Sequence, residues 1–408
     1  MEIIRGYKTE LDPNNKQKSA LKQHCGIARF AYNWGLKQRI DLYKNQGKSI
    51  NAIEQHKQLN ELKKSDFSWM YQCSKCAPQE ALRNLDKAFK KFFDNIKKFK
   101  SGKKVDKVGF PKFKSKKKGL GSFRLTGAIK VDTGHIKLPV IGWVKLKEHN
   151  YLPVDNVHIL SVTVSSRVDK WFVSLQVKES IQEPTETTSE IVGIDLGLNH
   201  LATCSNGVVF ENPRALKNNE KKLKRLQREV SRKLRNSKNR LKAKLKLAKQ
   251  HLKIFNIRKD VLHKITTSIV KTKPRVVVME TLNVKGMLRN HRLAKHIQDV
   301  SFGEFKRQME YKCKQNRIGL QFVSQWFPSS KTCSNCGHIQ DMPLSERIFK
   351  CDKCGLQIDR DMNASINLRD TVSSTGSACG DDVRLPLLEA VVCEAGIKHK
   401  SYSIDNFL

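Results

Sequence analysis

Two C-x2-C pairs constrain the fold of this chain more than any other feature of its sequence. Cys333 and Cys336 form the first pair, Cys351 and Cys354 form the second, and 14 residues separate the pairs. Each pair lets two thiolates from one tight turn reach a single tetrahedral ion, so the spacing predicts a zinc ribbon over 331–357. Four sulfur ligands leave no open coordination position, and this zinc should therefore be structural and not catalytic.

The remaining cysteine usage predicts free thiols. The chain has 11 cysteines, and a third C-x2-C pair, Cys73 and Cys76, has no second pair nearby, so we interpret it as a coincidence and not as a metal site. The amino terminus lacks the apolar core of a secretory signal, and no apolar run reaches 18 residues. We therefore expect no membrane partner and a cytoplasmic protein that is associated with the nucleoid through nucleic acid.

The charge balance points to a polyanionic partner. The 408 residues include 78 Lys and Arg against 39 Asp and Glu, which gives a formal net charge of +39. Cationic side chains gain affinity by releasing the counterions that are condensed on phosphates, so a surplus of this size favours nucleic acid. The length alone suggests two or three domains.

The spacing of apolar residues changes along the chain. A short alternating stretch at the amino terminus predicts a strand, and apolar residues at helical spacing predict a helical unit from residue 11 to about 100. From residue 109 to about 180, short alternating stretches broken by Gly, Pro and Asp predict a small β-barrel or sheet. The acidic stretch 179–190 is rich in Thr and is typical of a linker.

The most basic part of the chain follows this linker. Residues 217–253 contain 16 Lys or Arg and 2 Glu, with apolar residues at spacings of 3, 4 or 7. This pattern predicts a helical hairpin or one long helix with an apolar seam and a basic outer face. The expected seam is Leu223, Leu226, Val230, Leu234, Leu241, Leu245, Ala248 and Leu252.

The outer face of this basic stretch is a candidate nucleic-acid surface. A charged helix face is usually only solvated, but the one-sided excess of cations favours contacts with phosphates. The candidate residues are Lys224, Arg225, Arg228, Arg232 and Arg235.

Three carboxylates stand where catalytic acids are often found. Asp195 ends the apolar run "IVGID", and Glu280 ends the apolar run "VVVME". Asp361 lies near the start of a predicted helix that follows the zinc ribbon, although Asp359 or Asp361 could also serve only as a helix cap. A buried carboxylate needs a cation or a partner, and three of them can converge on a pair of magnesium ions that cleave a phosphodiester.

Taken together, these motifs resemble those of a known family, the TnpB proteins encoded by transposons, which are relatives of the type V CRISPR nucleases. The resemblance covers nearly all of the chain to about residue 370. Its motifs, in order, are "GIARFAYNWGL", "ALRNLDKAFKKFF", "GFPKFK", "LPVIGWVKLK", "GIDLGLNHLAT", "VVVMETLNVKGM", "FPSSKTCSNCG", "CDKCG" and "DRDMNASINL".

The resemblance implies an α/β multi-domain fold in which a zinc ribbon interrupts a RuvC-like RNase H domain. It also implies a helical recognition domain and a small wedge domain of the oligonucleotide-binding-barrel type. The implied boundaries are 1–10 and 109–182 for the wedge domain, 11–108 for the recognition domain, 190–330 and 358–370 for the nuclease domain, 331–357 for the zinc ribbon and 371–408 for a mobile tail.

The resemblance further implies RNA-guided cleavage of double-stranded DNA beside a short target-adjacent motif. The implied catalytic residues are Asp195, Glu280 and Asp361, which would hold Mg²⁺ or Mn²⁺, and Asp359 remains a neighbour. Lys75 and Gln79 are candidates for reading the adjacent motif, because such side chains can hydrogen-bond to base edges. The implied partners are a guide RNA from the transposon end and a DNA target, with the protein acting as a monomer with its RNA.

Two alternatives remain open on the sequence. One is a transposase that joins DNA strands with the same three carboxylates and needs no guide RNA. The other is a non-catalytic regulator that uses the zinc ribbon and the basic helices only to bind nucleic acid.

Overall fold

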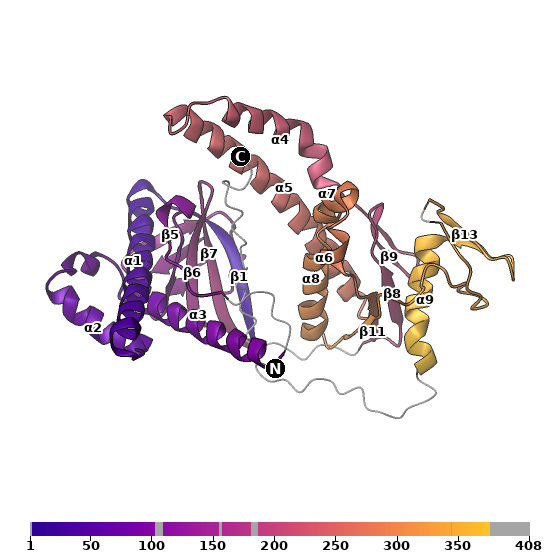
Figure 1. Ribbon diagram of the computed structural model, residues 1–408, viewed down its shortest axis with the longest axis horizontal. Coiled ribbons are helices and arrows are strands. Elements are labelled where there is room, and N and C mark those ends of the chain that lie inside the picture. The colour runs from indigo at the N-terminus through magenta and orange to yellow at the C-terminus, as the bar shows by residue number, and fades with distance from the viewer. Residues whose placement is uncertain (1, 103–108, 155–156, 181–186, 344, 376–408) are drawn as a thin grey trace. The chain divides into compact units, whose positions relative to one another are not determined.

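The computed structural model describes residues 2–102, 109–154, 157–180, 187–343 and 345–375. The described residues form two compact units, one before and one after the segment 181–186. The linker expected at 179–190 spans this boundary, and its central part lies outside the described residues. Each unit has its own hydrophobic core (Figure 1).

The first unit contains a seven-stranded antiparallel sheet. Its order is β2-β6-β7-β1-β5-β4-β3, with the amino-terminal strand β1 in the centre of the sheet. The ladder between β1 and β7 runs from Glu2 opposite Ser180 to Leu11 opposite Trp171. The strands are β1 (Glu2–Asp12), β2 (Ser122–Leu125), β3 (Lys130–Val131), β4 (His135–Leu138), β5 (Gly142–Leu146), β6 (Val157–Arg167) and β7 (Lys170–Ser180).

The helices of the first unit pack against this sheet. They are α1 (Asn15–Gln46), α2 (Ala52–Lys64) and α3 (Cys76–Lys100), with short 3₁₀ turns at Ser68–Gln72 and Lys116–Lys118. Asn14 starts α1 by a reciprocal capping box with Gln17. Buried residues of α3, such as Leu82 and Leu85, belong to the same core as Phe123 and Leu125 of β2. The predicted helical and strand segments therefore share one core.

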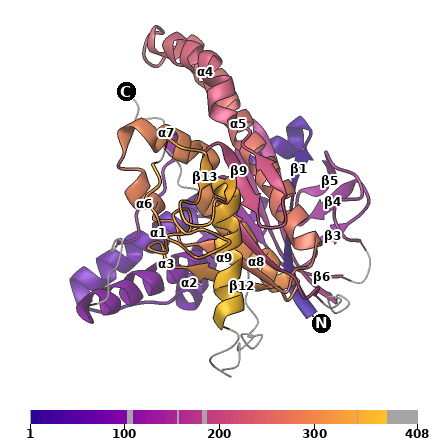
Figure 2. The same ribbon diagram turned by 90° about the vertical axis from the view of Figure 1, so that its right-hand side faces the viewer.

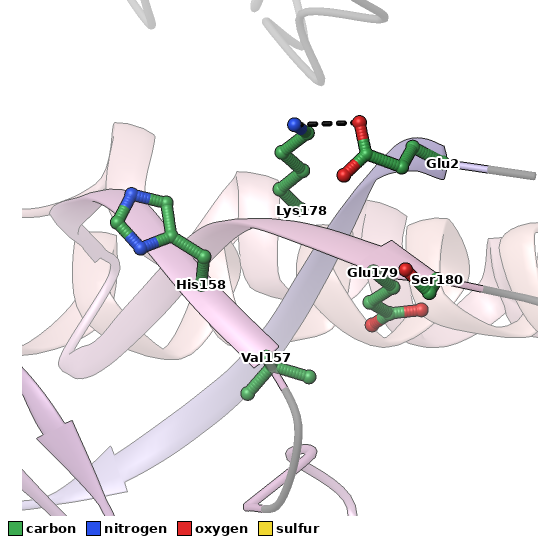
Figure 3. A pocket seen from close by; sticks show the side chains of 6 residues that line it. All are labelled: Glu2, Val157, His158, Lys178, Glu179 and Ser180. Carbon is green, nitrogen blue, oxygen red and sulfur yellow. Dashed lines mark ion pairs between the residues drawn. The ribbon is translucent and has the colours of Figure 1, made fainter.

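A hollow of about 500 Å³ lies at one end of the sheet in the first unit (Figure 3). Its walls come from β1, β6 and β7, and Lys178 closes part of it by an ion pair of 2.6 Å with Glu2. None of the residues that the sequence singles out for chemistry lines this hollow. The candidate catalytic acids and the predicted zinc ligands all belong to the second unit.

The second unit contains a five-stranded mixed sheet. Its order is β10-β9-β8-β11-β12, and the chain forms the antiparallel meander β8, β9 and β10 before adding β11 and β12 parallel to β8. The turn between β9 and β10 contains Asn206 and Gly207, and Gly207 adopts a φ of 87°, as the predicted hairpin requires. The strands are β8 (Ile191–Asp195), β9 (His200–Cys204), β10 (Val209–Glu211), β11 (Val276–Glu280) and β12 (Gly319–Val323).

Helices cover both faces of this sheet. The helices α5 (Lys238–Lys271), α7 (His291–Val300) and α8 (Phe302–Gln315) contribute to the core on one face, and α9 (Arg360–Thr375) packs against β8, β9 and β11 (Figures 1 and 2). The short α6 (Val284–Met287) follows β11. Ser301, with a φ of 63°, separates α7 from α8. Helix α9 continues five residues past the expected end of the nuclease domain, and residues 376–408 of the expected tail lie outside the described residues.

The basic stretch forms a helical hairpin, which we call the basic arm (residues 215–271). It consists of α4 (Ala215–Ser231) and α5, joined by a short turn. Leu223, Leu226 and Val230 are buried in the seam, as predicted. Three other seam residues are exposed, because the turn between the helices interrupts the register of the apolar spacing. The wrongly predicted seam residues are Leu234, Leu241 and Leu245, with exposed fractions of 80%, 62% and 39%.

None of the helices in the described part of the chain is long and apolar enough to span a membrane.

The basic arm supplies a matched pair of variants that tests the corrected seam. Leu226→Ala should lower the free energy of unfolding of the arm by about 2–4 kcal/mol, because it deletes buried methyl groups. Leu234→Ala should change it by no more than about 0.5 kcal/mol, because the side chain is exposed. Amide hydrogen exchange across 215–271 measures both effects, and equal protection in the two variants would contradict this assignment of the seam.

Candidate active site and metal centre

Asp195 and Glu280 lie side by side at the carboxyl ends of two neighbouring parallel strands. In the ladder between β8 and β11, Ile194 pairs with Met279, so the next residue of each strand lies at the same level. Val192 and Ile194 of β8 belong to the core on the α5 and α8 face. Because successive side chains of a strand point to opposite faces, Gly193 and Asp195 belong to the α9 face.

The same alternation holds in β11. Val277 and Met279 belong to the core under α5 and α8. Glu280 therefore shares the α9 face with Asp195. Two carboxylates thus reach the side of the sheet that α9 covers.

A close approach of α9 to β8 brings the third carboxylate to this place. A Cβ atom on Gly193 would lie 2.0 Å from the carbonyl oxygen of Ser365 and 2.6 Å from the amide nitrogen of Arg369. Only glycine lets the strand and helix backbones approach so closely. The first turn of α9 consequently lies beside the end of β8, and a Cβ atom on Gly197 would lie 3.8 Å from the carboxylate of Asp361.

The structure assigns different roles to the two aspartates at the start of α9. The Asp359 side chain is exposed and accepts hydrogen bonds from the backbone amides of Asp361 (2.9 Å) and Met362 (3.0 Å). It is therefore the helix cap. Asp361 is 13% exposed at its side chain and lies 3.6 Å from the guanidinium of Arg360.

The electrostatics of Asp195 show that the other two carboxylates lie close to it. Burial, together with the negative charges of Asp361 and Glu280, raises the pKa of Asp195 to about 7, and the positive charge of Arg360 only partly opposes this shift. Burial also raises the pKa of Glu280. The protein has thus gathered like charges without supplying enough cationic side chains to balance them.

These residues fit a site for divalent cations. Carboxylate oxygens are the ligands that Mg²⁺ and Mn²⁺ prefer, and a cation would offset the burial and the neighbouring negative charges that raise the pKa of Asp195. Among the described residues, the four cysteines are the group whose ligand atoms all lie within 4.8 Å of one another. The three carboxylates do not form such a group among the described residues, so their candidacy rests on the strand register, the close approach of α9 and the pKa of Asp195.

The predicted zinc ligands come together in the described structure. The sulfur atoms of Cys333 and Cys354 are 3.6 Å apart, and those of Cys336 and Cys351 are also 3.6 Å apart. Tetrahedral zinc with Zn–S bonds of about 2.3 Å requires sulfur atoms about 3.8 Å apart, whereas a disulfide requires about 2.0 Å. The four thiols fit one zinc ion.

The two halves of the ribbon repeat the same turn. In each, the amide of a glycine donates to the carbonyl of the first cysteine, from Gly337 to Cys333 (2.9 Å) and from Gly355 to Cys351 (3.0 Å). Both glycines have a positive φ, 71° and 73°. Two short strands, β13 (Ile348–Lys350) and β14 (Gln357–Asp359), form the only other regular structure of the described ribbon.

Two buried asparagines tie the base of the ribbon to α9. The Asn363 side chain donates to the carbonyl of Thr332 and accepts from the amide of Ser334, and Asn367 donates to the carbonyls of Ser329 and Thr332. All of these bonds are between 2.7 and 2.9 Å long. The "DMNASIN" spacing places both asparagines on one helix face, but their partners could not be inferred from the sequence.

The third cysteine pair, Cys73 and Cys76, makes other contacts in the described structure. Cys73 is buried, and the Cys76 thiol donates to the carbonyl of Thr126. Neither joins a cluster of metal ligands among the described residues, and the described cysteines are all free thiols. The interpretation of this pair as a coincidence stays a prediction.

The predicted nucleic-acid residues lie on accessible surfaces. Lys75 is exposed at the start of α3, and Gln79 is half-buried one turn later on the same face.

The five cationic candidates of the basic arm are all exposed, but Lys224 pairs with Glu220 at 2.9 Å. Lys295 and Lys224 hold the pKa of Glu220 down to about 2. Four candidate cations of the arm take no part in the ion pair between Lys224 and Glu220: Arg225, Arg228, Arg232 and Arg235.

A buried ion pair that the sequence did not predict fixes the root of the basic arm. Asp299, 7% exposed, accepts hydrogen bonds from the amides of Leu216 and Lys217 at the first turn of α4. It also pairs with the guanidinium of Arg258 at 2.7 Å. The acceptor for these amides lies more than 80 residues away in the chain, so no local pattern predicts it.

The zinc centre leads to a prediction about metal content. The protein should contain one equivalent of zinc, and Cys333→Ser or Cys351→Ser should lose it and unfold the ribbon, whose apolar core is small. Cys76→Ser is the control and should keep the zinc. Elemental analysis and thermal unfolding test this, and a folded, fully active Cys333→Ser variant without zinc would overturn the structural role.

Three family models match parts of this chain. The family OrfB_IS605, described as a probable transposase, matches residues 172–291, and the Cas12f1-like TNB domain matches residues 302–368. A family described as a helix-turn-helix domain matches residues 1–48. In the described structure, residues 2–46 form strand β1 and the single uninterrupted helix α1, and not a helix-turn-helix.

A solved structure shares the fold. The cryo-EM structure of a Cas12f1–sgRNA–target DNA complex contains a chain with a TM-score of 0.54 and 15% sequence identity. The match covers 90% of this chain and 99% of that chain. The common architecture is therefore an α/β multi-domain fold.

Relatives identify the family, and two of those named here match nearly the whole chain. A protein of Streptomyces pristinaespiralis, provisionally named an RNA-guided DNA endonuclease, is 34% identical over 94% of this chain and 92% of its own length. The provisionally named RNA-guided DNA endonuclease InsQ of Escherichia coli is 31% identical over 94% of this chain and 96% of its own length. TnpB-like protein L79 of Acanthamoeba polyphaga mimivirus is 30% identical over 37% of this chain and 30% of its own length. The chain belongs to the TnpB family.

Proposed function

We propose that this protein is an RNA-guided endonuclease that cleaves double-stranded DNA beside a short target-adjacent motif by metal-dependent phosphodiester hydrolysis. The observation that carries the proposal is the gathering of Asp195, Glu280 and Asp361 on the α9 face of the second unit. The relatives' names supply the class of reaction, and the sheet order β10-β9-β8-β11-β12 supports a RuvC-like RNase H domain.

The three carboxylates would hold a pair of Mg²⁺ or Mn²⁺ ions. Divalent cations bound there supply the activation of water and the stabilisation of the leaving oxygen in phosphodiester hydrolysis. The close approach of α9 to β8 keeps Asp361 beside Asp195. Arg360 lies next to this site, where its positive charge would favour a phosphate.

The remaining parts of the chain would bind the nucleic acids. A guide RNA from the transposon end would select the target by base pairing, while the protein would hold the heteroduplex by its backbone and shape. The basic arm would contact phosphates, and Lys75 and Gln79 would read the adjacent motif. The protein would act as a monomer with its RNA.

The first test of this proposal replaces each acid. Asp195→Ala, Glu280→Ala and Asp361→Ala should each abolish cleavage while binding of guide RNA and target DNA persists, because each acid would ligate catalytic metal. Asp359→Ala is the matched control: it should lose helix-cap stability of about 1 kcal/mol and still cleave.

Cleavage of a radiolabelled target by the purified protein with its guide RNA measures these effects. Full cutting by any one of the three acid variants would remove that residue from the mechanism. A strand-joining transposase would instead process transposon ends without RNA, and a non-catalytic regulator would keep its biological effect in Asp195→Ala.

A second test concerns the basic arm. Arg228→Ala, Arg232→Ala and Arg235→Ala combined should weaken nucleic-acid binding and reduce the slope of log affinity against log salt by about 0.7–0.9 for each phosphate that the variant no longer neutralises. Lys224→Ala should have a smaller effect, because Glu220 already pairs with this side chain. Titrations across salt concentrations measure the slopes, and parallel slopes with equal affinity would mean that the arm is only solvated.

A further inference from the structure

Trp326 is the most exposed large hydrophobic residue in the described part of the chain. Its exposed fraction is 82%, and it lies in the segment between β12 and the zinc ribbon. Trp171, by comparison, is 4% exposed, and Trp69 and Trp143 are 42% and 45% exposed. A large aromatic ring that is left in water gives up the stability that its burial would contribute. This residue therefore requires an explanation.

The segment that carries Trp326 is an ordered series of turns. The amide of Trp326 donates to the Ser324 hydroxyl (3.3 Å), and the amide of Phe327 donates to the carbonyl of Ser324 (3.1 Å). The amides of Lys331 and Thr332 both donate to the carbonyl of Pro328 at 3.0 Å. The indole ring is thus presented on a backbone that is already organised for contact.

Both ends of this segment are attached to elements that carry the candidate catalytic acids. At one end, Val323 of β12 pairs with Glu280 of β11, and the amide of Thr281 donates to the carbonyl of Val323 (2.9 Å). At the other end, Asn367 of α9 donates to the carbonyl of Ser329 (2.7 Å).

The length of the chain limits how far Trp326 can lie from the acids. Trp326 lies three positions after Val323, and an extended chain spans about 10 Å over three positions. The backbone of Trp326 therefore lies near the edge of the sheet that carries Asp195 and Glu280, within reach of a nucleotide next to a phosphate that those acids would hold.

We infer that Trp326 stacks on an unpaired base of the DNA strand that is being cut, next to the scissile phosphate. This inference rests on the proposed function and adds a base-binding position to the same site. A neutral aromatic plane is suited to the face of a base and not to a phosphate, and stacking tolerates any sequence. An unpaired base is required, because a base within a duplex has both faces covered by its neighbours.

The test combines variants of Trp326 with an abasic scan of the target. Each target lacks one base near the cleavage position, and single-turnover cleavage is measured with saturating protein and guide RNA. On the wild-type protein, one or two neighbouring abasic positions should slow cleavage about 5- to 100-fold, in line with the strength of stacking.

Trp326→Ala should slow cleavage of the intact target by a similar factor and should be insensitive to the same abasic positions. Trp326→Phe should retain most of the wild-type rate, whereas Trp326→Leu, which is apolar but lacks a planar face, should behave like Trp326→Ala. The control Ile339→Ala truncates a 60% exposed residue of the ribbon and should behave like the wild type.

Cleavage of the intact target by the wild-type protein is the internal check on the proposed function. If the wild type does not cleave, the proposed nuclease function is wrong, and this outcome is distinct from a failure of the stacking inference. If the wild type cleaves, then an equal rate for Trp326→Ala, a full rate for Trp326→Leu, or equal abasic sensitivity in wild type and Trp326→Ala would overturn the stacking inference. Sensitivity to abasic positions in the guide RNA alone would overturn it as well. Zinc content and thermal unfolding of each variant show that it is folded.

Discussion

The contact between the backbones of β8 and α9 is the constraint on which the second unit depends. Because Gly193 has no side chain, Ser365 and Arg369 can lie against the strand, where any Cβ atom would meet the carbonyl of Ser365. This contact places residues from opposite ends of the unit, Asp195 and Asp361, at one position. Without it, the ordered strand and the ordered helix would each persist, but the carboxylates would not converge.

The electrostatic repulsion among the three carboxylates is the second constraint on the second unit. The fold brings three carboxylates together, and burial together with the negative charges of Asp361 and Glu280 raises the pKa of Asp195 to about 7 in a chain whose net charge is +39. The many Lys and Arg side chains of this protein could neutralise the three carboxylates. Among the charged side chains that act on Asp195, however, only Arg360 opposes the rise of its pKa. The arrangement is typical of a site that is completed by bound cations and not by side chains.

The zinc ribbon is attached to the elements that carry the candidate catalytic acids. It enters the chain between β12 and α9, and Asn363 and Asn367 fasten its base to the helix that carries Asp361. Zinc bound by the four cysteines would thus order the connection between β12 and α9. Trp326 lies in the connection between β12 and the ribbon, so the proposed stacking position depends on both neighbours.

The sequence predicts the local features of this protein better than its long-range contacts. The cysteine spacing, the strands that end in Asp195 and Glu280, and the hairpin at Gly207 follow from short patterns, and the structure contains all of them. The apolar spacing places Leu234 on the wrong face, because the turn between α4 and α5 breaks the helical period. Gly193 is the one available signal of a close approach, a glycine inside a buried strand, whereas the anchor at Asp299 has no local signal.

The most direct measurement is the anomalous scattering of Mn²⁺ in crystals of the protein bound to its guide RNA. The account predicts a pair of manganese peaks among Asp195, Glu280 and Asp361, with oxygens of these carboxylates among the direct ligands of the ions. Absence of manganese from these three carboxylates at saturating concentration, or manganese bound elsewhere with Asp361 turned away from Asp195, would contradict it.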